Sequence, residues 1–159
     1  MQAVRTNNRA FSLIELVIVV VILGIIGAIA IPRMSRGAAG AADSAVMADI
    51  ATLRNAIEMY RAEHNGAYPT DATTIADQLT QFTDISGDAQ ATKDATHVYG
   101  PYLHAIPRQK VGAQAGKNGI SSTDGDANAG WIYVPATGKI YANCAVGVAD
   151  QNGIDYRDY

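Results

Sequence analysis

The chain has 159 residues, a formal net charge of −3 and a single cysteine, Cys144. This length suits one domain better than two, the lone cysteine excludes an intrachain disulfide, and the acidic balance argues against a general nucleic-acid-binding surface. Hydrophobic residues make up 48% of the chain, and they are concentrated near the N-terminus.

Residues 11–31 form the most apolar stretch of the chain, interrupted only by Ser12, Glu15 and two glycines. A helix rises about 1.5 Å per residue, so this stretch spans roughly 30 Å, the thickness of the hydrocarbon core of a bilayer. A carboxylate costs about 2.5–3.5 kcal/mol at the centre of a membrane helix and less near the interface. Glu15 is therefore predicted to have a functional partner; a tolerated charge, neutralised by proton uptake, is the alternative.

The residues around position 10 carry a specific signature, in which Ala10 precedes the run Phe-Ser-Leu-Ile-Glu-Leu and a long apolar segment. This pattern resembles the class III prepilin signal of type IV pilins and type II secretion pseudopilins. The resemblance implies cleavage after Ala10 by a prepilin peptidase and N-methylation of the new N-terminus, Phe11. It also implies that Glu15 acts in assembly, as the counter-charge for the Phe11 amine of a neighbouring subunit. The family usually has glycine before the cut, but alanine is also small, so cleavage is still expected.

Residues 1–10 are polar and basic, and Arg5 and Arg9 are expected to keep the N-terminus in the cytoplasm while the rest of the chain is exported. A conventional signal peptide, cut in the alanine-rich stretch at residues 38–42, is the alternative. Glu15 argues against it, because the apolar region of an ordinary signal peptide does not carry an acid.

Gly24, Gly27 and Pro32 are predicted weak points of this helix. Glycine costs up to about 1 kcal/mol in a helix interior and proline about 3 kcal/mol. Membrane helices commonly tolerate both residues. The resemblance adds a second interpretation, in which this region loses helical structure when the subunit leaves the lipid for a filament.

Residues 33–65 are predicted to continue the helix as an amphipathic half that ends at Asn65-Gly66, a C-cap signal. Apolar residues spaced three and four apart form one stripe, and the stripe comprises Val46, Ile50, Leu53, Ile57 and Tyr60. The simplest partner for this stripe is a sheet. A free coiled coil is the alternative, although two heptads are short for one.

Residues 66–159 are predicted to form a small globular head. A short helix is expected through Ile75, Leu79 and Phe82, followed by a surface loop at 83–96 and a mobile glycine-rich loop at 112–130. The clearest strands are 131–134 and 139–142, whose aromatic and β-branched residues flank a four-residue turn and indicate an antiparallel hairpin.

The head also resembles the major pseudopilin of type II secretion, through the stretches YRAEHNGAYPT (residues 60–70) and GPYLHAIP (residues 100–107). In that family the proline is usually followed by Asp-Pro-Trp-Gly. Here Arg108-Gln-Lys-Val-Gly follows Pro107, so the family's site is not carried over to this loop.

Calcium is the one candidate cofactor. Two short stretches alternate oxygen ligands, as calcium loops do, and the candidate ligands are Asp124, Asp126, Asp150 and Asp155. Pseudopilins of the resembling class bind calcium in C-terminal loops. Aspartates next to glycine are also ordinary turn residues, which is the competing interpretation. The chain shows no zinc, nucleotide or nucleophile motif that would point to catalysis.

These observations predict an α+β fold, in which a long N-terminal helix is packed by a small antiparallel sheet. The predicted organisation is a cleaved leader at 1–10, a transmembrane and filament-core helix at 11–32, an amphipathic helix at 33–65, and a head at 66–159.

The predicted function is that of a non-enzymatic structural subunit of a helical filament, with a type II secretion pseudopilin preferred. The alternatives are a type IV pilus subunit, major or minor, for adhesion, twitching or DNA uptake, and an enzyme tethered by a signal anchor.

The resemblance implies other copies of the chain, related minor subunits, the prepilin peptidase and methyltransferase, and an inner-membrane platform with its ATPase as partners. The chain is expected to cross the inner membrane once, with a periplasmic head, before it enters a periplasmic or surface filament.

Overall fold

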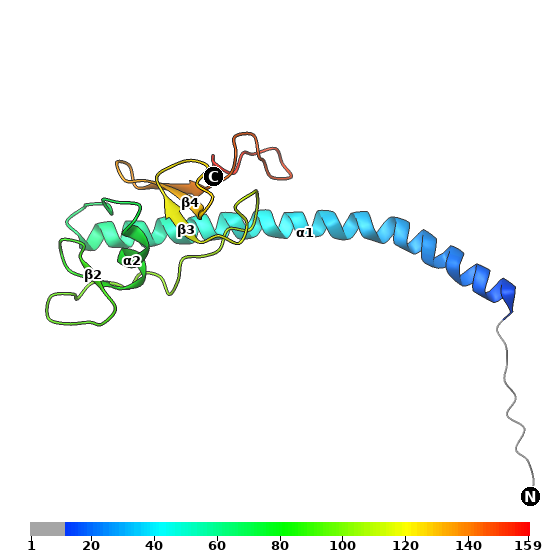
Figure 1. Ribbon diagram of the computed structural model, residues 1–159, viewed down its shortest axis with the longest axis horizontal. Helices are drawn as coiled ribbons and strands as arrows, with labels where there is room; N and C mark the ends of the chain where they lie inside the picture. Colours follow the sequence, from blue (N-terminus) through cyan, green and yellow to red (C-terminus); the bar gives the residue numbers. More distant parts are fainter. Residues whose placement is uncertain (1–11) are drawn as a thin grey trace, which may run out of the picture. The chain divides into compact units, whose positions relative to one another are not determined.

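The computed structural model describes residues 12–159, except for the side chains at positions 32, 35 and 36. Ala10 and Phe11 lie outside the described residues. The elements are α1 (Leu13–Glu63), α2 (Ile75–Thr80), β1 (Phe82–Thr83), β2 (Ala89–Gln90), β3 (Gly119–Ser121), β4 (Ala129–Val134) and β5 (Lys139–Ala142), shown in Figure 1. The predicted α+β fold is confirmed, and the predicted long helix corresponds to α1, which has 51 residues.

The chain divides into two compact units, with the boundary between Ala38 and Ala39. In the first unit, the stretch Leu13–Ile31 has a mean hydropathy of 3.1 and no part of it is buried by the chain. Among the described residues it is the one helical stretch long and apolar enough to cross a membrane. Its composition and length therefore support anchoring in a membrane.

In the second unit, α1 supplies the predicted apolar stripe to the core. Val46, Ile50, Leu53, Ile57 and Tyr60 are each at most 3% exposed. They pack with Trp131, Tyr133 and Ile140 of the sheet and with Ile75 and Leu79 of α2. The spacing of three and four residues explains this burial, because it places all five side chains on one face of the helix. The sheet-packed stripe is thus confirmed.

The central strand of the head is β4, which pairs antiparallel with β5 and parallel with β3. Pairs from Trp131–Ala142 to Val134–Lys139 give the predicted hairpin with its four-residue turn. Gly138 closes this turn with a positive φ of 69°, and the ring of Tyr68 lies where a side chain would project. The predicted hairpin and its four-residue turn are confirmed, and β4 begins at Ala129, two residues before the predicted strand.

Three short strands occupy segments for which the sequence indicated no strand. β1 and β2 pair antiparallel at the predicted surface loop, and β3 lies within the predicted glycine-rich loop. The predicted extent of the short helix to Phe82 is wrong, because α2 ends at Thr80 and Phe82 begins β1. Strands of two or three residues contain too few alternating positions for a sequence pattern to reveal them. The parallel pairing of β3 also makes the three-stranded sheet mixed rather than purely antiparallel.

Polar contacts fasten the C-terminal segment to α1. The buried carboxylate of Asp43 accepts hydrogen bonds from the hydroxyl of Tyr156 and the backbone N–H of Gln151. Eleven residues further along α1, the Arg54 guanidinium donates to the carbonyl oxygens of Ile140, at 3.3 Å, and Tyr159. These contacts hold the end of the chain against α1 without a covalent link.

The core position of Leu53 gives a direct stability test. Leu53→Ala is expected to lower the free energy of unfolding by about 2–5 kcal/mol, because the deleted side chain is fully buried and leaves a cavity. Met59→Ala, on the same helix at 55% exposure, is the matched control and should change it by no more than about 0.5 kcal/mol. Urea unfolding of the full chain in detergent, followed by the fluorescence of Trp131, measures both. Equal losses in the two variants would contradict the packing described here.

Candidate functional site

Glu15 lies in the first turn of α1, where its carboxylate binds the start of the helix. The backbone N–H of Ser12 donates to a carboxylate oxygen of Glu15 at 2.9 Å, and the N–H of Leu16 donates to the Ser12 carbonyl oxygen at 3.2 Å. An acid three residues after a serine satisfies an N–H that the helix itself leaves unpaired. Its negative charge also lies at the positive end of the helix dipole. The sequence signal for this contact, Ser-x-x-Glu, was present but was not recognised in the sequence analysis.

The contact fixes Glu15 close to the predicted processing position. Ser12 immediately follows Phe11 in the sequence, so the carboxylate is held beside the peptide bond that adjoins the expected new N-terminus. The placement of Ala10 and Phe11 lies outside the described residues. Cleavage, N-methylation and the pairing of Glu15 with a neighbouring amine therefore stay predictions.

The surface around Glu15 is apolar and uncovered. The large side chains from Leu13 to Ile31 are 47–79% exposed. Nothing lies within 4 Å of the position that a Cβ would take at Gly24 or Gly27, so no close packing within the chain requires these glycines. The helix is continuous through Gly24, Gly27 and Pro32. Their predicted unwinding concerns an assembled state and stays a prediction.

The four aspartates predicted as calcium ligands all have partners within the head. Asp124 pairs with the guanidinium of Arg157 at 2.6 Å and accepts from the Tyr141 hydroxyl at 3.0 Å. Asp126 accepts from the backbone N–H of Asn128 at 2.9 Å.

The other two aspartates hold turns of the C-terminal segment. Asp150 accepts from the N–H groups of Asn152 and Ile154, each at 2.8 Å, and Asp155 accepts from that of Gly147 at 2.7 Å. The hydrogen bond from the Tyr159 hydroxyl, together with weaker contributions from other hydrogen bonds, lowers the pKa of Asp150 to about 2. Within residues 12–159, no three His, Cys, Asp or Glu side chains gather as a metal site. Calcium binding stays a prediction, and the turn-forming role is the one with observed contacts.

The remaining reactive residue types serve the core. Cys144 is buried, and burial raises the pKa of its thiol, which disfavours the reactive thiolate. His64 is 2% exposed and stacks on Tyr60 with ring centroids 3.7 Å apart. Its ring nitrogens lie 2.8 Å from the Tyr60 carbonyl oxygen and 2.9 Å from that of Asp84.

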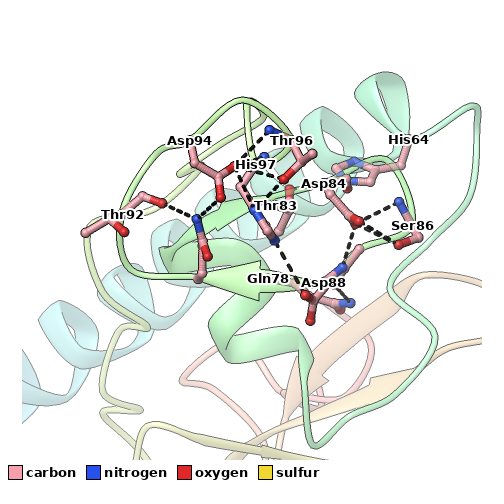
Figure 2. Close-up of polar contacts among 12 residues, drawn as sticks. His64, Gln78, Thr83, Asp84, Ser86, Asp88, Thr92, Asp94, Thr96 and His97 are labelled. Carbon is pink, nitrogen blue, oxygen red and sulfur yellow. Dashed lines mark hydrogen bonds and ion pairs between the residues drawn. The ribbon is translucent and has the colours of Figure 1, made fainter.

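Figure 2 shows a polar cluster in the loop around β2 that the sequence analysis described only as a surface loop. Asp94 accepts from the backbone N–H of His97 at 2.7 Å and contacts the His97 Nδ1 at 3.0 Å, while the Nε2 lies 3.5 Å from Asp88. Asp84 holds the preceding turn through the N–H groups of Ser86 and Asp88, each at 2.9 Å. The spacings Asp-x-Ser and Asp-x-Thr are typical of such turns and were the available signal.

The comparison with known families identifies one region. Residues 5–31 match the model of the prokaryotic N-terminal methylation motif. No curated protein and no solved structure matches the chain. The motif is a type IV prepilin-like signal, it is followed here by the long apolar helix, and it supports a type IV pilin-like subunit in general.

The polar cluster around His97 predicts a pH-dependent loop. The hydrogen bond to Asp94, followed by that to Asp88, raises the pKa of His97, and the bonds from His97 hold the pKa of Asp94 well below its usual range. The stabilisation from protonated His97 is complete below about pH 6.5 and is lost as the pH rises through the raised pKa. The stabilisation from ionised Asp94 is present above about pH 4 and is lost on further acidification.

Asp94→Asn is therefore expected to lower the pKa of His97 in an NMR titration of the full chain in detergent. Asp88→Asn is the matched control and should lower it less, because Asp88 lies farther from the ring. An unchanged His97 titration in Asp94→Asn would contradict the assigned contact.

Proposed function

We propose that the chain is a structural subunit of a helical filament, cleaved after Ala10, methylated at Phe11 and assembled from the inner membrane. The observation that carries this proposal is the coincidence of the N-terminal methylation motif with an apolar helix that the chain itself leaves uncovered. In the membrane, lipid covers this helix; in the filament, the same surface packs against other copies. The function is architectural rather than enzymatic.

The replacement of lipid contacts by contacts with other copies is compatible with an assembly that an ATPase drives. Lipid tails are as apolar as leucine side chains, so hydrophobic burial does not itself pull helices together out of a bilayer. The free-energy difference between lipid and filament contacts can then be small. A repeated head-to-tail contact that does not close a ring gives an open filament. The proposed partners are further copies, related minor subunits, the prepilin peptidase and methyltransferase, and an assembly platform with its ATPase.

Glu15 is proposed to specify the position of each incoming subunit. The carboxylate, already held at the start of α1, pairs with the Phe11 amine of a neighbouring copy. An unpaired carboxylate is costly in an apolar surrounding. Because the charges match in only one axial position, the pair selects the register more than it adds to stability.

Within this class we propose a type II secretion pseudopilin. The single cysteine rules out the C-terminal disulfide loop that many pilins have, and the hairpin of β4 and β5 agrees with a pseudopilin-like head. The stretch at residues 100–107 also resembles the major pseudopilin. The second candidate is a subunit of a surface type IV pilus, which the departure from the pseudopilin pattern after Pro107 favours.

Two substitutions of Glu15 separate its charge from its contact with the helix terminus. Glu15→Ala is expected to insert and to be cleaved, with mass spectrometry finding methylated Phe11 at the N-terminus, but to lose assembly. Glu15→Gln keeps an oxygen that can accept from the Ser12 N–H and removes the charge, so it should fail to assemble as well. The assembled fraction is measured by cross-linking in the envelope and by shearing. Normal assembly of Glu15→Gln would show that Glu15 serves the helix terminus alone.

The location of the mature chain distinguishes the two machines. Shearing of cells, followed by immunoblotting of the sheared and envelope fractions, should find the wild-type chain confined to the envelope if it belongs to a secretion pseudopilus. A strong band in the sheared fraction would overturn that assignment and identify a surface pilus. Deletion provides the matching readout, with loss of exoenzyme secretion expected in the first case and loss of twitching or DNA uptake in the second.

A further inference from the structure

Charge is separated between two segments of the head. The acidic segment, residues 77–94, contains four aspartates and Lys93 as its only base, so its formal charge is −3. The basic segment, residues 108–117, contains Arg108, Lys110 and Lys117 and no acid, so its formal charge is +3. The two segments thus carry equal and opposite formal charge in a chain that is acidic overall.

The two segments contact α1 at different levels along its length. The acidic segment reaches the end of the helix, where the Asp84 carbonyl oxygen lies 2.9 Å from the Nε2 of His64, and Figure 1 shows β2 beside this end. The basic segment contacts α1 closer to the N-terminal end of the helix, where Lys110 Nζ lies 3.8 Å from the Asp49 carboxylate. Positions 49 and 64 are 15 residues apart, so at about 1.5 Å per residue the two segments are offset by roughly 22 Å along the helix axis.

The charged groups of both segments are available at the surface. The Asp88 side chain is 79% exposed, and Arg108 and Lys117 are exposed as well. Among the ion pairs found in residues 12–159, none joins the acidic segment to the basic segment, and none includes Arg108 or Lys117. The two segments therefore do not pair with each other within one copy. Asp88 and Asp94 instead contact His97, and Lys110 contacts Asp49.

We propose that the acidic segment of one copy binds the basic segment of a second copy, displaced by roughly 20 Å along α1 in the direction of its C-terminal end. This inference rests on the proposed filament function and names the head surfaces that meet. The contact joins two different patches, so it repeats without closing a ring and suits a filament. Opposite charge on the two patches favours this partner and this direction over like-to-like contacts.

Cysteine cross-linking tests the contact directly. The full chain carrying both Asp88→Cys and Lys117→Cys, assembled in the envelope and treated with a bifunctional maleimide, should give a ladder of dimers, trimers and larger species. Co-expression of the two single variants should give dimers and no ladder, because each copy then has one of the two partners. The wild-type chain is the background control, since its Cys144 is buried. Dimers from Asp88→Cys alone would indicate a like-to-like contact and would overturn the proposal.

Charge reversal supplies an independent measurement. Asp88→Lys or Lys117→Asp alone should lower the assembled fraction about threefold to fivefold, the size expected for an exposed contact of up to about 1 kcal/mol. The double reversal should restore it to within about twofold of wild type. The matched controls are Asp158→Lys and Lys139→Asp, which reverse exposed charges outside both segments and should leave assembly unchanged. Failure of the double reversal to restore assembly would overturn the proposed pairing.

The outcomes separate this inference from the proposed function. Normal assembly of the wild-type chain without a ladder in the double-cysteine chain would refute the head contact and leave the filament function in place. A wild-type chain that shows no assembled fraction, in the envelope or in the sheared material, would refute the filament function and the head contact together.

Discussion

The structure depends on one constraint, which is that α1 carries two kinds of surface on a single helix. From position 39 onward, an apolar stripe on one face is covered by the sheet and α2 of the same chain. From Leu13 to Ile31 the helix is apolar on all sides and the chain covers none of it. A helix of this kind needs an apolar environment from outside. The head can fold on its half of α1, whereas the other half requires lipid or further copies.

The head holds its C-terminal segment in place without a disulfide. Its C-terminal segment lacks regular secondary structure beyond isolated bridges, and ordering such a segment costs roughly 1–2 kcal/mol per residue in backbone entropy. Hydrogen bonds to the buried Asp43 and from Arg54 to the Tyr159 carbonyl oxygen anchor it to α1, and Asp150 and Asp155 hold its turns. A buried charged acceptor contributes more than a neutral one. Asp150 and Asp155 thus have a structural role in this segment that does not depend on a bound ion.

Glu15 meets a local demand at the start of α1 and, in the proposed filament, an intermolecular one as well. Locally, its carboxylate satisfies the Ser12 N–H and lies at the favourable end of the helix dipole. Intermolecularly, a charge in an apolar layer is tolerated best beside an opposite charge. The two demands are compatible, because the first holds the carboxylate at the place where a neighbour's terminal amine would have to arrive. In the proposed filament, the oppositely charged segments of the head would attract each other through solvent, where salt screens the attraction over about 10 Å.

The sequence by itself determined the long helix, its apolar half and the core stripe, because their hydrophobic pattern extends over many residues. It also determined the β4–β5 hairpin, because aromatic and β-branched runs flank a glycine-containing turn. It also contained the processing motif around Ala10, whose signature is local. Only the tertiary structure decided the two-residue strands, the parallel β3, the partners of Asp124 and Asp150, and the polar cluster of His97. The pairing of β3 and the contacts of Asp124 with Tyr141 and Arg157 join segments that lie apart in the chain, which no local pattern encodes. The contacts of Asp150 and His97 with residues nearby in the sequence are turns, whose Asp-x-Ser, Asp-x-Thr or Asp-x-Asn spacing indicates a turn but not its exact partners.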